Sequence, residues 1–293
     1  MSLRDRSFRR YAGEVTPRRS RFLVLWRYSR REVFSSKLAT GLFALSFAPL
    51  LVAAILVYLR HNLPALQALE LEAGDVLPID GNFFYWLLRL QAGCAFLLTA
   101  LVGPGLVSPD LANNGLPLYL ARPFSRAEYV LGKLAVLAIL ISAITWVPLL
   151  LIFALQASLE PGWMAENLRL AWGLFAGSWV WILLVGLFAL ALSAWVRWRI
   201  LAGALLVATF VMGTGFGEVV NEIFDGRQLQ YSWGDLFSPG QLVLGIWQGL
   251  LFGGDAASVA RVPLAVAWMM VALACVMALL VLNRKLRAYE VVR

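Results

Sequence analysis

The stretch RLAWGLFAGSWVWILLVGLFALALSAWV, residues 169–196, decides the fold class. Its one charged residue, Arg169, stands at the very start. About 20 apolar residues in a helix cover the roughly 30 Å hydrocarbon core of a bilayer. Backbone polar groups inside lipid must be paired within their own segment, and a helix pairs them. The stretch therefore predicts a transmembrane helix.

Five further stretches share this character, and the chain is 61% hydrophobic and 14% charged. Soluble domains carry roughly a quarter charged residues. We therefore predict an all-α integral membrane protein with a cytoplasmic tail over 1–37 and a six-span domain over 38–293. The six spans are expected near 38–59, 86–107, 134–157, 169–196, 200–217 and 263–282.

No ionisable side chain lies near the middle of a predicted span. Carriers driven by protons or sodium usually hold carboxylates, Lys, Arg or His at membrane depth. If this chain transports a substrate, we expect the energy to come from outside the membrane plane. Arg89, near the outer end of span two, is expected to reach the external headgroups, with contact to a substrate as the alternative.

The basic residues predict the orientation, because Lys and Arg are concentrated in cytoplasmic loops. Placing both termini in the cytoplasm puts 20 of the 25 Lys and Arg inside and 11 of the 17 acidic residues outside. The formal charge of +8 is thus explained by topology rather than by nucleic-acid binding. We predict a multi-pass protein of the bacterial cytoplasmic (inner) membrane.

A basic segment precedes the first span. Over residues 20–37 its apolar side chains recur at helical spacing, which favours a helix lying on the membrane lipids. A basic tail that only fixes topology remains the alternative. The residues expected to carry the interfacial helix are Phe22, Trp26, Arg27, Arg30 and Arg31.

The external segment 218–262 separates spans five and six. Its apolar part, 241–252, is too short to cross a membrane and predicts a re-entrant or interfacial helix. Just before it, the glycine-rich stretch 213–217 is expected to bend the end of span five.

The most specific stretch is GPGLVSPDLANNGLPLYLARPFSRAEYVLGK, residues 103–133, between spans two and three. Ser108, Pro109 and Asp110 predict a cap and turn that end span two. Ser125 with Glu128 three residues later forms a capping box, which predicts the start of the next helix. A short, rigid cytoplasmic elbow is expected, with an ordinary turn as the alternative.

This loop resembles that of permease subunits in ATP-binding-cassette (ABC) exporters of the second type. That family has an acidic residue after span two, a leucine-rich turn, a P-x-S/T-R element and a Tyr-x-x-Gly-Lys start to span three. The matching positions are Asp110, Leu120, Pro123, Ser125, Arg126, Tyr129, Gly132 and Lys133. Six spans and re-entrant helices between spans five and six extend the resemblance over nearly the whole chain.

The resemblance implies a pore between two permease copies, identical or related, lined by spans one, two and five. It also implies that a cytoplasmic ATPase subunit receives the elbow in a groove and acts on it and on the 20–37 helix. The residues expected to couple to the ATPase are Asp110, Asn113, Leu120, Arg122, Pro123, Ser125, Arg126, Glu128, Tyr129 and Lys133.

The chain has no ATP site of its own. A phosphate-binding loop needs G-x-x-x-x-G-K-S/T. The only Gly-Lys pair is Gly132-Lys133, which is followed by Leu134, and Ala127 occupies the first glycine position. ATP and magnesium are therefore expected on the partner, and no cofactor or metal in this chain.

Two rival functions remain. An intramembrane enzyme needs a base at depth, but the only histidine, His61, lies at the outer edge of span one. A scaffold subunit that transports nothing is harder to separate from a permease. Scattered polar groups in apolar spans favour an amphiphilic substrate, and export follows from the resemblance alone.

Overall fold

The structure is a computed structural model that describes residues 33, 34, 36–62, 78–112, 126–196, 198–225, 231–253 and 261–287. Within these ranges the regular elements are all helical. They are α2 (Lys37–Leu45), α3 (Ala48–Arg60), α5 (Gly81–Val102), α6 (Pro104–Ala112), α8 (Arg126–Ser142), α9 (Trp146–Leu159), α10 (Trp163–Glu166), α11 (Leu168–Trp195), α12 (Arg199–Asp225), the 3-10 helix η2 (Trp233–Phe237), α13 (Pro239–Phe252) and α14 (Leu264–Arg287).

Six helical segments are long and apolar enough to cross a membrane, which confirms the predicted number of spans. They are Lys37–Arg60, Gly81–Asp110, Ala127–Leu159, Leu168–Trp195, Arg199–Phe224 and Leu264–Lys285. The second segment starts earlier than predicted because Asp80 caps α5. Its carboxylate accepts the backbone N–H of Phe83 at 3.0 Å, which satisfies one unpaired donor of the first turn.

The predicted end of span five at residue 217 is wrong, because α12 continues as a helix through residues 213–217 to Asp225. The glycines of this stretch allow close packing against the segment that follows. A Cβ added at Gly213 would lie 2.5 Å from the carbonyl oxygen of Phe237, and one at Gly217 would lie 2.5 Å from that of Gly234. Gly213 and Gly217 therefore lie where the tertiary packing leaves no room for a side chain.

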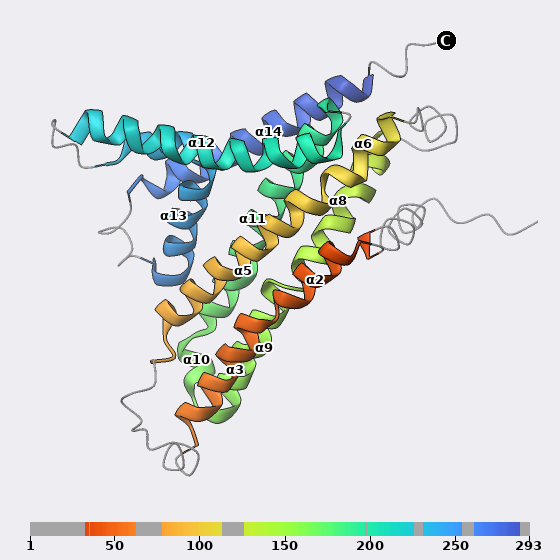
Figure 1. Cartoon of the computed structure of the whole chain (residues 1–293). Coiled ribbons are helices and arrows are strands. Elements are labelled where there is room, and N and C mark those ends of the chain that lie inside the picture. Colours follow the sequence, from red (N-terminus) through yellow and green to blue (C-terminus); the bar gives the residue numbers. More distant parts are fainter. Residues whose placement is uncertain are drawn as a thin grey trace, which may run out of the picture.

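Helix α11 is the centre of the fold. It packs against α5, α6, α8, α9, α12, α13 and α14, and 67% of its most apolar window is buried. The corresponding fraction is only 22% for α2–α3, 28% for α12 and 17% for α14. These outer helices therefore present most of their apolar surface to lipid or to another protein. Figure 1 shows α12 running across the upper end of α11, steeply inclined to both α5 and α11.

Three of the spans are interrupted, between α2 and α3, between α5 and α6 at Gly103, and between α8 and α9. At the first and the last of these breaks, the freed backbone groups or the proline can be accounted for. Between α2 and α3 the backbone turns at Ser46 and Phe47, and the Ser46 carbonyl accepts a hydrogen bond from Gln91 of α5 at 3.1 Å. Between α8 and α9 the turn ends at Thr145, so Pro148 falls in the first turn of α9. Proline is tolerated there because that N–H would have no partner within the helix.

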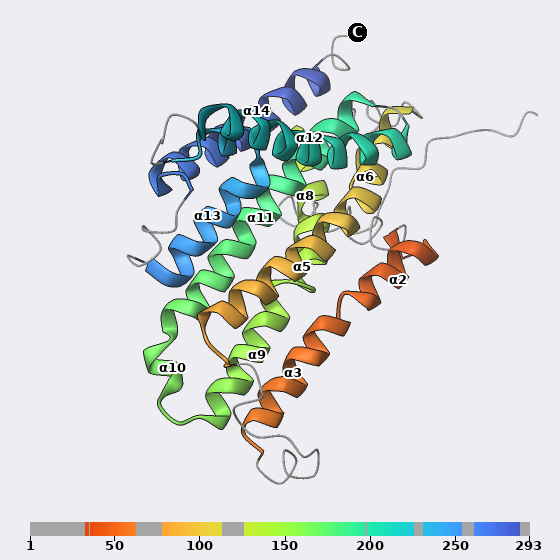
Figure 2. The ribbon, with the colours of Figure 1, turned by 60° about the vertical axis from the view of Figure 1, so that its left-hand side comes forward.

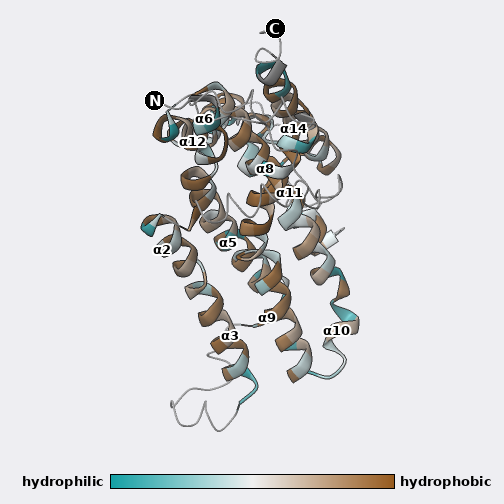
Figure 3. Ribbon diagram, turned by 90° about the vertical axis from the view of Figure 1, so that its right-hand side faces the viewer, coloured by the Kyte–Doolittle hydropathy of each residue, from teal (hydrophilic) through white to brown (hydrophobic). Residues whose placement is uncertain are grey.

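The helix ends gather at two poles, and apolar residues dominate between them (Figure 3). At one pole, here called the elbow end, α6 and α11 end and α8 and α12 begin. Lys285 of α14 also lies there, 5.2 Å from the ring of Trp195. At the opposite end, α5 and α11 begin and α3 and α9 end, with His61 3.7 Å from Glu160.

Helix α13 confirms a helix over the apolar residues 241–252 between spans five and six. It runs alongside α11 and α5 (Figure 2). Its last residues reach the opposite end, where Arg169 of α11 donates hydrogen bonds to the carbonyl oxygens of Gly249 and Leu250 at 2.9 and 3.1 Å. These bonds satisfy carbonyls that a helix C-terminus leaves unpaired.

Candidate functional site

An ion pair joins α6 and α8, the two helices on either side of residues 113–125, here called the elbow loop. The ammonium of Lys133 lies 2.9 Å from Oδ2 of Asp110, and the hydroxyl of Tyr129 donates to the same oxygen at 2.8 Å. Lys133 also lies 5.6 Å from the centre of the Tyr129 ring. Oδ2 of Asp110 thus forms an ion pair with Lys133 and accepts a hydrogen bond from Tyr129, next to the point where the elbow loop begins.

The sequence positions explain this convergence. Tyr129 and Lys133 are four residues apart in α8, so they share one face of the helix. Asp110 lies two residues before the end of α6. The side chain of Lys133 is only 7% exposed and that of Asp110 19%, and Tyr129 is buried. A buried ammonium needs a counter-charge and hydrogen bonds, and Asp110 supplies the charge.

A serine pair connects the same region to the central helix. The Ser193 hydroxyl of α11 accepts from the Ser108 backbone N–H and donates to the Pro104 carbonyl, both at 2.9 Å. It therefore bridges two α6 groups that are four residues apart. The Ser108 hydroxyl in turn lies 2.8 Å from the carbonyl oxygen of Val196, the residue that caps α11.

This arrangement corrects the predicted cap and turn at residues 108–110. Ser108, Pro109 and Asp110 lie inside α6, which continues to Ala112. The Ser108 hydroxyl does serve a helix end, but it is the end of α11, 85 or more residues away in the chain. Ser193 was missed because nothing in its own neighbourhood distinguishes it from other small residues in an apolar span.

The geometry fastens both ends of the elbow loop to the body of the protein. The ion pair ties α6 to α8, and the serine pair ties α6 to α11. Helix α11 packs in turn against most of the other helices. Residues Asp110 of α6 and Lys133 of α8 are thus connected to the centre of the bundle through α6 and α11.

The remaining predicted site residues have the following places. Arg126 is the first residue of α8, and Glu128 lies in its first turn. The residues that lie outside the described part are Asn113, Leu120, Arg122, Pro123 and Ser125 in the loop, and Phe22, Trp26, Arg27, Arg30 and Arg31 in the expected interfacial helix.

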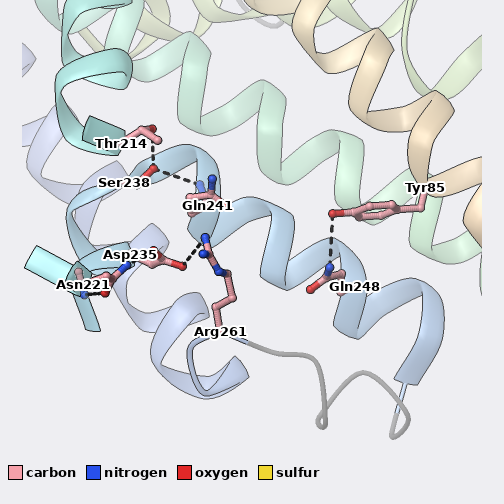
Figure 4. A network of polar contacts seen from close by, with 9 residues as sticks. Tyr85, Thr214, Asn221, Asp235, Ser238, Gln241, Gln248 and Arg261 are labelled. Atoms are coloured by element: carbon pink, nitrogen blue, oxygen red, sulfur yellow. Dashed lines mark hydrogen bonds and ion pairs between the residues drawn. The ribbon is translucent and has the colours of Figure 1, made fainter. Parts of the chain in front are cut away.

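A second polar cluster connects α12, η2, α13 and Arg261 (Figure 4). The buried carboxylate of Asp235 accepts from the Asn221 amide at 2.8 Å and lies 3.6 Å from the Arg261 guanidinium. Nearby, the hydroxyls of Thr214 and Ser238 are 2.8 Å apart. These bonds hold the segment before α13 against α12.

Across the described residues, no three His, Cys, Asp or Glu side chains form a group that could hold a metal ion. Cys94 and Cys275 are free thiols. No protein family model and no curated protein sequence matches the chain. The six-span helical architecture and the contacts around the elbow are therefore the basis for a functional proposal.

Proposed function

We propose that this chain is the membrane-spanning permease subunit of an ATP-driven ABC exporter, coupled to a separate ATPase through residues 108–133. The observation that carries the proposal is the Asp110–Tyr129–Lys133 contact at the base of the loop. It joins two spans at the place where the sequence resembles the ATPase-coupling loop of such permeases.

The elbow end is assigned to the cytoplasm because it carries the basic excess of the sequence. Both termini are then cytoplasmic, and the protein belongs in a bacterial inner membrane. With this orientation α13 is a re-entrant helix that rises toward the outer surface. The interfacial helix over 20–37 would rest on the inner leaflet beside the ATPase.

A second permease copy, identical or related, would complete the pore. The largely unburied surfaces of α2–α3 and α12 support this, since they leave apolar faces for lipid and for a partner. The pore would lie between the copies and be lined by spans one, two and five. ATP and magnesium would bind to the ATPase subunits, since this chain has no phosphate-binding loop.

The proposal is tested by purifying the chain from its native membranes in a mild detergent. We expect a partner carrying G-x-x-x-x-G-K-S/T to co-purify and to hydrolyse ATP. Reversing charge in Asp110→Lys or Arg126→Glu should reduce hydrolysis in the complex about tenfold, equivalent to about 1.4 kcal/mol. The control is Lys285→Met, which removes a basic residue at the same pole but outside the loop. Unchanged hydrolysis in both charge-reversed complexes would refute coupling through the elbow.

A further inference from the structure

Two cavities meet at Arg89 of α5. Each has a volume of about 430 Å³, within the range of small-molecule sites. Arg89, Gln241 and Leu244 line both cavities, so the two are adjoining parts of one site. The parts differ in chemistry, because one is walled mainly by aromatic and aliphatic side chains and the other by polar ones.

The apolar part has a wall of four packed aromatic rings. Phe96 and Phe210 are 4.8 Å apart, Trp181 lies 5.8 Å from Phe210, and Trp247 lies 5.9 Å from Trp181. Both indole N–H groups already donate to backbone carbonyls of neighbouring helices, at 3.0 and 2.9 Å. The wall therefore offers ring surface rather than hydrogen-bond donors, which suits an apolar chain or ring system.

The polar part carries a surplus of positive charge. Its polar lining consists of Tyr85, Arg89, Asp235, Gln241, Gln248 and Arg261. The single carboxylate, Asp235, is already engaged by Arg261 and Asn221. Figure 4 shows Arg261 directed toward that carboxylate and Gln248 facing Tyr85 across the site.

Arg89 supplies the available charge. Its guanidinium lies 4.9 Å from the centre of the Trp86 ring, and no carboxylate in the described ranges is within ion-pair distance of it. An arginine in a partly apolar site gains most from an anion, because charge-assisted hydrogen bonds to carboxylate or phosphate are among the strongest in proteins.

We infer that this site binds an anionic amphiphile, with the anion at Arg89 and the polar part and the apolar portion against the aromatic wall. The role of this amphiphile as the exported cargo rests on the proposed function, whereas its binding to the site does not. The arrangement selects against neutral amphiphiles, which leave Arg89 without a counter-ion, and against cationic ones, which Arg89 repels. This proposal takes up the alternative expected for Arg89, contact with a substrate, in place of contact with lipid headgroups.

The test is a binding titration on the full-length chain, without ATPase, in a neutral detergent. The probes are a terminally brominated undecanoic acid and its uncharged methyl ester, since bromine quenches tryptophan on contact and Trp181 and Trp247 line the apolar part. We expect the acid to bind about tenfold more tightly than the ester.

Variants separate the two parts of the site. Arg89→Gln should lower the affinity for the acid to that for the ester. Arg89→Lys should retain most of the preference for the acid over the ester. Phe210→Ala should weaken both probes. Arg284→Gln, at an exposed arginine of α14 far from the site, should match the parent protein. Equal quenching by acid and ester, or undiminished acid binding in Arg89→Gln, would overturn the assignment.

Two further measurements test whether the bound anion is the exported cargo or a membrane lipid. In nanodiscs rich in phosphatidylglycerol, retained acid binding supports a cargo site, and displacement by the lipid would overturn the cargo assignment. Stimulation of the complex's ATPase by the acid but not the ester supports transport of this class. Acid binding by a chain that co-purifies with no ATPase from its native membranes would refute the proposed function but not the site, and an active complex without anion preference would refute only the site.

Discussion

Breaking the Asp110–Lys133 pair is the sharpest test of the elbow's architecture. Lys133→Met removes the ammonium and keeps most of the packing volume, while Asp110→Asn removes the negative charge and leaves the ammonium in a site where it is 7% exposed. Exposed ion pairs contribute about 0.2–1 kcal/mol, but loss of one partner from a buried pair costs about 3–5 kcal/mol.

The exposures place this pair near the buried limit, so we expect Asp110→Asn to cost about 3 kcal/mol. In a protein of this size that corresponds to a fall in Tm of roughly 6–12 °C. The double variant Asp110→Asn/Lys133→Met removes both charges together. It should recover to within about 1 kcal/mol of the parent, since a neutral pair leaves no uncompensated buried charge.

The assay is thermal unfolding in detergent, followed by the loss of monodisperse protein on size exclusion. Lys285→Met is the matched control, because that lysine lies over Trp195 and should contribute about 1 kcal/mol or less. Single variants as stable as the control, or a double variant whose loss equals the sum of the singles, would refute the coupling between the two residues.

Three further substitutions test other contacts in the same assay. Ser193→Ala should cost about 1–3 kcal/mol because it leaves backbone groups of α6 unpaired, whereas Ser158→Ala at an exposed position should change little. Gly213→Ala should cost about 1–3 kcal/mol, since its Cβ would meet the Phe237 carbonyl oxygen; Gly215→Ala, with open space around it, should be neutral or stabilising. Asp235→Asn should cost about 1–3 kcal/mol by weakening the contacts to Asn221 and Arg261, while Glu166→Gln at an exposed site should not. Each prediction fails if the variant and its control unfold at the same temperature.

The sequence was sufficient for the helical spans because length and apolarity are local properties. Residues 169–196 predicted α11 to within a residue at either end, since any apolar stretch of that length must form a helix in lipid. Where the prediction failed, a distant segment decided the outcome. Span five was predicted to end at the glycines of 213–217, but α12 continues through them, and Phe237 and Gly234 pack against two of them.

The elbow shows the same division between local and distant effects. Asp110, Tyr129 and Lys133 were predicted as site residues, but no pattern indicated that they meet at one carboxylate oxygen. Ser193 could not be found at all, because its role depends on α6 passing beside α11. Arg89 likewise acquires its significance only when Gln241 and Asp235 are brought near it by α13 and η2.

If this chain is an ATP-driven permease, a second polypeptide must hold and move the elbow, and cross-linking in native membranes tests this most directly. A photoreactive amino acid is placed at Leu120, with Met164, exposed on α10 at the opposite end, as the control position. We predict a light-dependent adduct between position 120 and a subunit carrying a phosphate-binding loop, and none from position 164. Absence of that adduct at Leu120, Pro123 and Ser125 in cells that make a functional protein would contradict the account.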